Sequence, residues 1–180
     1  MVVGARSLAP DTPKRRELVE LGLHFRLDDE QIAPVLEAVG DDQRLRSVLS
    51  AYEEDEAVYA RACETDKAWD PIACALAPAA EEGPWPARGV IGGARALQVD
   101  DDESWITHLD PLEVADVAGY LRELDDLQFS RLYAQMPEEL RNPEYGPDEE
   151  RYALTWLTAL RQFFAAADEE RAHVVFTVSL

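Results

Sequence analysis

Alternating apolar and polar residues mark the strands that this chain is expected to form. Leu23, Phe25 and Leu27 alternate with polar neighbours, and the same two-residue period recurs over 105–109 and 173–178. This period places apolar side chains on one face of a strand. The pattern therefore predicts strands at 23–27, 105–109 and 173–178, and a short fourth strand at 94–98.

Apolar residues at three- and four-residue spacing predict helices over much of the remaining chain. The predicted helices cover 29–39, 41–52, a segment from about 55 to 62, 111–124, 127–133 and 147–168. Asp28 and Asp110 precede two of these helices as expected N-caps. Because the strands do not alternate regularly with the helices, the pattern indicates an α+β fold.

These elements predict a single α+β domain over residues 22–180. It would hold a small mixed or antiparallel sheet of about four strands packed with about six helices. Residues 1–21 are predicted to be an N-terminal extension with a short helix over 12–21, since Thr12-Pro13 is typical of a helix start.

The charge balance narrows the classes of partner. The chain carries 37 acidic residues against 17 lysines and arginines, which gives a formal charge of −20. Nucleic acids and anionic membranes both need a basic face, so neither is an expected partner. A basic protein would be attracted at low salt. The acidity also has a simpler explanation, which is solubility.

The expected compartment is the cytoplasm. The sequence contains no signal peptide and no apolar stretch of the roughly 18–20 residues that cross a membrane. Cys63 and Cys74 match neither a metal-binding spacing nor a CxxC motif. Their alanine-rich, helix-like surroundings predict buried, reduced thiols.

The segment Asp66-Lys67-Ala68-Trp69-Asp70 combines two acids, a base and an indole in five residues. Lys67 is one of only two lysines in the chain. In a continuous helix, Asp66 and Asp70 would share a face and could perform acid–base chemistry if burial separated their pKa values. Pro71 favours a helix boundary near Asp70 instead, with Trp69 anchoring the junction and the charges pairing locally.

A second candidate, Trp85, stands between two prolines in the Pro- and Gly-rich segment 78–93. Such a segment inside a compact domain is often a functional loop. We expect Trp85 to be exposed there, either as an anchor for a partner or as a seal over the core.

The histidines give a weaker signal. His24, His108 and His173 each fall on a predicted strand, opposite its apolar residues. If the strands were adjacent, the three rings would face the same side and form a metal site. The simpler interpretation is three separate polar positions, and we predict no metal and no cofactor.

With these elements laid out, the chain resembles the YfbM-like family, a bacterial domain of unknown function. The resemblance rests on Leu23–Asp28 leading to Ile32, on the Asp66–Asp70 segment, and on Val90-Ile91-Gly92-Gly93 followed by 106–117. Ala73 replaces a histidine that is common in the family, and the family's Ile-Tyr-Pro segment is reduced to Glu144-Tyr145-Gly146. The resemblance implies one α+β domain over about 22–180, no known cofactor and, for some relatives, a toxin-immunity role.

Catalytic signatures are missing from the sequence, which has no G-x-S-x-G, no S-x-x-K and no phosphate-binding glycine loop. The leading prediction is therefore a non-enzymatic, acidic module that binds a basic protein, with a toxin as one form of that partner. The alternative is an enzyme or small-ligand-binding protein with a cleft around Asp66, Lys67, Trp69 and Asp70.

Overall fold

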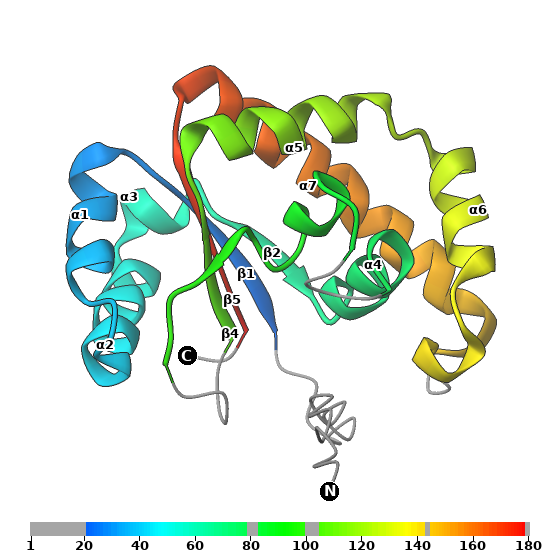
Figure 1. The fold of residues 1–180 in the computed structure, drawn as a ribbon, viewed down its shortest axis with the longest axis horizontal. Coiled ribbons are helices and arrows are strands. Elements are labelled where there is room, and N and C mark those ends of the chain that lie inside the picture. The colour runs from blue at the N-terminus through cyan, green and yellow to red at the C-terminus, as the bar shows by residue number, and fades with distance from the viewer. Residues whose placement is uncertain (1–20, 79–82, 100–104, 143–144, 179–180) are drawn as a thin grey trace, which may run out of the picture.

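The computed structural model describes residues 21–78, 83–99, 105–142 and 145–178 (Figure 1). Its centre is one antiparallel sheet in the order β2-β1-β5-β4-β3. The strands are β1 Gly22–Leu27, β2 Cys63–Asp66, β3 Arg95–Ala96, β4 Trp105–Leu109 and β5 His173–Val178. The α+β prediction is confirmed, with five strands in place of about four.

Three strands agree with the alternating pattern, and two differ from expectation. β1, β4 and β5 match the predicted ranges within one residue. β3 is shorter than the predicted 94–98. β2, at Cys63–Asp66, is a strand that was not predicted, and it directly follows the helix that was expected from about 55 to 62. That helix, α3, spans only Glu56–Tyr59. The predicted helix at 12–21 lies outside the described residues, except for Leu21.

The helices cover both faces of the sheet, as Figure 1 shows. On one face lie α1 Asp29–Glu37, α2 Asp42–Glu54 and the short α3. On the other face lie α4 Trp69–Leu76, α5 Pro111–Glu123, α6 Asp126–Gln135 and α7 Glu149–Glu170. Each layer buries its own apolar cluster against the sheet. None of the helices in the described part of the chain is long and apolar enough to cross a membrane.

Aspartate caps start many of these helices. Asp28 accepts hydrogen bonds from the N–H groups of Glu30 and Gln31, and the Gln31 side chain bonds back to the Asp28 N–H in a capping box. Asp110 and Asp125 form the same arrangement at α5 and α6. A cap of this kind contributes about 1 kcal/mol. Part of the acidity is therefore used for helix initiation.

The two apolar clusters account for the position of α7. One cluster lies between the sheet and α1–α2, and it includes the fully buried Phe25, Leu45 and Leu49. The larger cluster includes Leu157 and Phe164 of α7. Their burial matches the wide apolar stripe that the sequence places on this helix, and it makes α7 the central support of that layer.

Candidate functional site

The candidate segment Asp66–Asp70 forms the junction between β2 and α4. Asp66 is the last residue of β2 and has a left-handed backbone, with φ of 47°. α4 begins at Trp69, so Asp66 and Asp70 do not share one helix face. The alternative of a continuous helix is wrong, because Thr65 is held in the sheet by a hydrogen bond from its Oγ1 to the Gly22 carbonyl at 3.1 Å. The favoured helix boundary near Asp70 is confirmed.

Asp66 is fixed by an aromatic residue from the other end of the chain. The Tyr152 hydroxyl, on α7, donates to Asp66 Oδ2 at 2.7 Å and accepts from the Lys67 N–H at 3.2 Å. Burial, followed by the hydrogen bond to Asp66 and its charge, raises the pKa of Tyr152 well above its usual range. The phenol therefore stays protonated and acts as a donor at neutral pH.

Two further aromatic rings surround this phenol. Tyr145 stacks on Tyr152 with ring centres 5.3 Å apart, and Trp156 meets it edge-on at 6.5 Å. Sequence reasoning missed this cluster. Tyr152 and Trp156 are spaced four residues apart, which indicates a shared helix face, but that spacing carries no information about contact with residue 66.

Trp69 has the anchoring role that one interpretation of the motif predicts. Its ring packs against Trp105 and Phe176, with centres 5.8 Å and 6.3 Å away. A Cβ placed on Gly22 would lie only 2.7 Å from Trp69 Cδ1. The close approach of β1 to this indole therefore requires glycine at position 22. Asp70 lies in the first turn of α4, where its charge suits the helix dipole.

Trp85 belongs to a different part of the molecule. Its Nε1 donates to Asp116 of α5 at 2.9 Å, and the Arg88 guanidinium lies over the ring at 5.9 Å. The side chain is half-buried and packs against the larger apolar cluster. The expectation of an exposed aromatic is therefore wrong, and these contacts correspond to the alternative in which Trp85 seals the core.

The sheet register separates the three histidines. His24 lies opposite Phe176 and faces α7, where its Nε2 is 3.2 Å from the Val90 carbonyl. His108 and His173 lie on the opposite face, with Nε2 of His108 3.0 Å from Nδ1 of His173. A three-histidine metal site is thus excluded, and no group of three potential metal ligands occurs within the described ranges.

The two buried histidines are neutral at pH 7. Burial lowers the pKa of His24 to about 4. Burial also lowers the pKa of His108 to about 4, and the neighbouring His173 and Arg95 act in the same direction. On the far side of the pair, His173 Nε2 is 3.3 Å from Asp29 Oδ1 of α1.

Both cysteines are free thiols, in agreement with the prediction. Cys63 lies on β2, where burial, followed by the charge of Glu64, raises its pKa to about 11. It is therefore an unreactive thiol. Cys74 is partly buried on α4. The expected helical surroundings are wrong for Cys63 and correct for Cys74.

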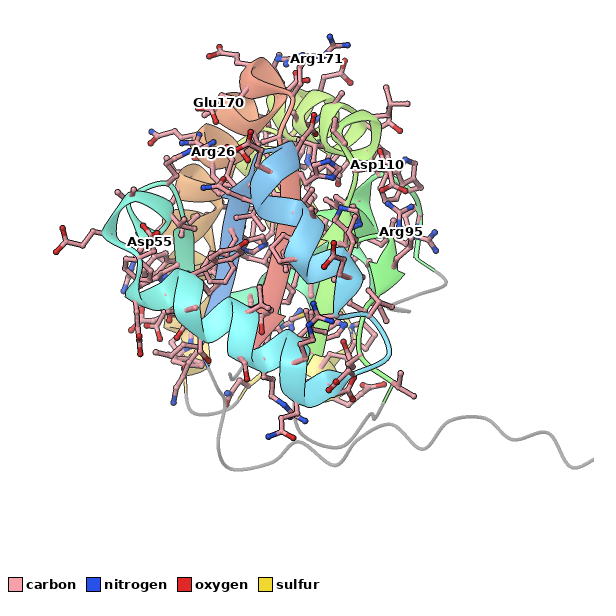
Figure 2. The ribbon with its side chains drawn as sticks, turned by 90° about the vertical axis from the view of Figure 1, so that its left-hand side faces the viewer. Arg26, Asp55, Arg95, Asp110, Glu170 and Arg171 are labelled. Atoms are coloured by element: carbon pink, nitrogen blue, oxygen red, sulfur yellow. The ribbon has the colours of Figure 1, made fainter. Side chains whose placement is uncertain are left out.

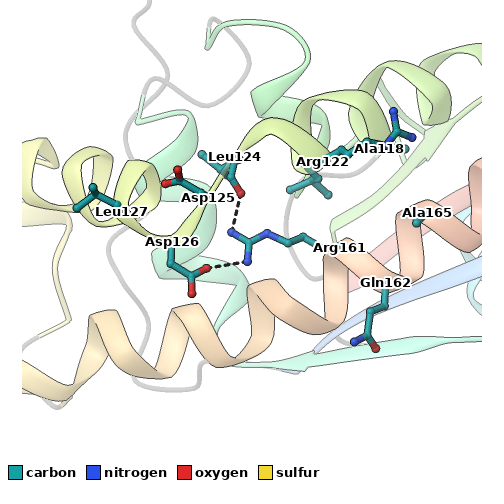
Figure 3. Close-up of a pocket in the computed structure, with 10 residues that line it drawn as sticks. Ala118, Arg122, Leu124, Asp125, Asp126, Leu127, Arg161, Gln162 and Ala165 are labelled. Atoms are coloured by element: carbon teal, nitrogen blue, oxygen red, sulfur yellow. Dashed lines mark hydrogen bonds and ion pairs between the residues drawn. The ribbon is translucent and has the colours of Figure 1, made fainter.

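Two open hollows mark the α4–α7 side, and none of the five candidate residues lines either one. The first, of about 720 Å³, lies between the α5–α6 connection and α7 (Figure 3). Arg161 crosses it and donates to the Leu124 carbonyl and to Asp126, both at 2.7 Å. The second, of about 670 Å³, adjoins the buried Glu149, which accepts from the Tyr133 hydroxyl at 2.6 Å.

A carboxylate-rich surface covers the opposite side of the molecule. Residues 28–56, which we name the acidic layer, span α1 and α2 and reach the start of α3, and they carry ten carboxylates against two arginines. Nine of the ten acidic side chains are exposed. Figure 2 looks onto this layer. Asp28, Asp41 and Asp55 cap helices, and Glu37 lies 3.4 Å from Arg44.

Comparison with known proteins places this domain in a family. A family model described as a domain of unknown function, DUF1877, matches residues 20–177. The chain belongs to the DUF1877 family. The match includes the acidic layer, the β2–α4 junction and both helical layers. These surfaces are therefore part of the DUF1877 domain itself.

A solved relative has the same fold. The crystal structure of YfbM from Escherichia coli, a protein of unknown function, aligns with a TM-score of 0.66 at 17% identity. The alignment covers 88% of this chain and 99% of YfbM. No curated protein matches this DUF1877 chain. At this identity the likeness shows the fold alone.

Proposed function

We propose that this DUF1877 protein is a non-enzymatic binding module whose acidic layer holds a basic protein partner. The density of negative charge on that layer carries the proposal. Residues 28–56 have a net charge of −8 over 29 positions, from ten acids and two arginines. Residues 110–171 have −9 over 62 positions, from fifteen acids and six arginines. Charge is thus about twice as dense on the acidic layer.

The contacts of the other candidate residues support this choice. Asp66 is committed to Tyr152, Trp69 to the core and Trp85 to Asp116. These are the contacts of structural residues. On the acidic layer, by contrast, Glu53, Glu54 and Glu56 are exposed carboxylates that cap no helix. Such charges attract a basic surface and raise its association rate.

An immunity-like role, with a basic toxin as the partner, is the most specific form of this proposal. Its support is the family resemblance together with the charge that such a complex would use. The cytoplasm is the compartment in which we expect the complex to form.

The test compares two variants that lose the same charge. Glu53, Glu54 and Glu56 are changed to Gln in one variant, and the exposed Glu123, Glu138 and Glu139 in its matched control. The probe is a fluorescein-labelled peptide of alternating lysine and alanine, and its affinity is measured by anisotropy. Measurements at about 0.01 M and about 0.15 M salt span Debye lengths of about 30 Å and 8 Å.

We expect salt-sensitive binding that the acidic-layer variant weakens by about tenfold, since exposed ion pairs contribute about 0.2–1 kcal/mol each. The control variant should lose less than about threefold, because its charges lie outside the layer. An equal loss in both variants would show that net charge alone attracts the peptide. That result would contradict a binding layer.

The alternative of an enzyme or small-ligand-binding protein with a cleft around Asp66, Lys67, Trp69 and Asp70 stays a prediction. One observation favours it, namely the left-handed Asp66 beside the half-buried phenol of Tyr152, because unusual backbone conformations cluster at functional sites. An activity or ligand affinity that Tyr152→Phe removes without unfolding the domain would support this alternative.

A further inference from the structure

Exposed aliphatic side chains gather at one corner of the acidic layer. Seven large hydrophobic residues are exposed in the described part of the chain: Leu21, Leu36, Val39, Tyr59, Val99, Leu112 and Leu127. Leu36, in the last turn of α1, is 42% exposed, and Val39, in the turn that follows this helix, is 50% exposed. Two residues separate them, and the Val39 N–H donates to the Leu36 carbonyl at 3.4 Å in the turn that ends α1, while Val35 and Ala38 are fully buried on the core side.

Val99 comes to this corner from a distant part of the sequence. Its backbone N–H donates to Asp42 Oδ1 at 2.9 Å, and Asp42 is the first residue of α2. The preceding Leu97 is held against β4 by its N–H bond to the Ile106 carbonyl at 2.9 Å. The Val99 side chain is 69% exposed. We name Leu36, Val39 and Val99 the aliphatic corner.

The charges around the aliphatic corner restrict what can cover it. Glu37, Asp41 and Asp42 lie between or beside its members in the sequence. Of the arginines close in sequence, Arg44 lies within 3.4 Å of Glu37, and Arg95 is paired with Glu113 at 2.6 Å. A second copy of this chain would bring its own dense carboxylates toward them, and like charges at an interface are unfavourable. A covering partner therefore needs basic groups beside its apolar ones.

We propose that the aliphatic corner takes the aliphatic side chains of a basic, amphipathic segment of the partner, whose lysines or arginines contact the surrounding carboxylates. This inference rests on the proposed function and adds the chemistry of the segment that is recognised. Carboxylates provide attraction and orientation, while the apolar contact adds affinity that salt does not screen. Removing roughly 60 Å² of aliphatic surface from water corresponds to about tenfold in affinity.

The experiment uses two labelled peptides of equal length and equal positive charge. In the first peptide, leucines at positions i, i+3, i+4 and i+7 form one helical face. In the second peptide, alanine replaces every leucine. The full-length protein is titrated with each peptide, and a Leu36→Gln, Val39→Gln variant is compared with a Leu112→Gln, Leu127→Gln control. The control positions are more exposed, at 78% for Leu112 and 61% for Leu127, and belong to α5 and α6.

The leucine peptide should bind the wild-type protein about tenfold more tightly than the alanine peptide. The Leu36→Gln, Val39→Gln variant should lose this preference and keep its affinity for the alanine peptide, whereas the control should keep the preference. Equal binding of both peptides, or a preference that survives in the variant, would overturn the inference and leave the acidic layer intact as a binding surface. Absence of salt-sensitive binding to either peptide would refute the proposed function as well. Self-association of the chain that the variant abolishes would show that the corner serves a second copy instead.

Discussion

Acidification should destabilise this protein through its two buried, neutral histidines. His24 is 1% exposed and His108 is 4% exposed, and the pKa of each is lowered to about 4 in the folded state. In the unfolded chain both rings regain a pKa near 6.5. Between these two values the unfolded state binds more protons than the folded state. The contribution of these two histidines to stability is therefore present above about pH 6.5 and is lost as the pH falls toward 4.

The size of this effect follows from linkage. Between pH 7 and pH 5, a histidine whose pKa falls from 6.5 to about 4 on folding costs about 1.8 kcal/mol of unfolding free energy. The two histidines together give about 3.7 kcal/mol, which is a large share of a typical domain stability of about 5–15 kcal/mol. Most carboxylates titrate below pH 5, so they change the stability difference between pH 7 and pH 5 little.

Urea unfolding at pH 7, 6 and 5, followed by circular dichroism, measures the loss. His24→Gln is the informative variant, because His24 contacts three phenylalanine rings and backbone groups of Val90 and Cys63, none of which titrates. This variant should reduce the difference between pH 7 and pH 5 by about 1.8 kcal/mol. An unchanged difference would refute the reasoning. If the variant does not fold, NMR titration of the wild-type rings gives the same test, and a native His24 pKa near 6.5 would contradict it.

Two further changes test the β2–α4 junction. Tyr152→Phe removes the hydrogen bond to Asp66 and should lower the unfolding free energy by about 1.5–3 kcal/mol, since the acceptor is charged. The control is Thr158→Val, which removes an exposed hydroxyl further along α7. Equal urea midpoints for the two variants would contradict the anchoring role of Tyr152. Gly22→Ala places a Cβ 2.7 Å from Trp69 and 2.6 Å from Thr65 Oγ1, so it should lower the unfolding free energy by about 1–3 kcal/mol and shift the tryptophan emission. In the control Gly119→Ala, the added Cβ meets nothing within 4 Å, so this variant should be neutral or stabilising. Equal melting temperatures for the two alanine variants would refute the close packing at Gly22.

Local patterns determined much of the fold. β1, β4 and β5 follow from apolar alternation, and α1 and α5 begin where Asp28 and Asp110 supply caps. Both signals act between residues only a few positions apart, so the sequence displays them directly. β2 shows the limit of such signals. Its four residues have little apolar pattern, and they become a strand because β1 pairs with them.

Tertiary structure alone decided which side chains meet. Asp66 and Tyr152 are 86 residues apart, and Val99 reaches Asp42 across 57 residues. Alternation correctly placed each histidine opposite the apolar residues of its own strand. The register between strands then placed the His24 side chain on one face of the sheet and the side chains of His108 and His173 on the other. The physical reason is that the two-residue period of a strand decides which of its side chains lie on the same face of that strand. The hydrogen-bonded register with the neighbouring strands then decides which face of the sheet these side chains share with residues of other strands.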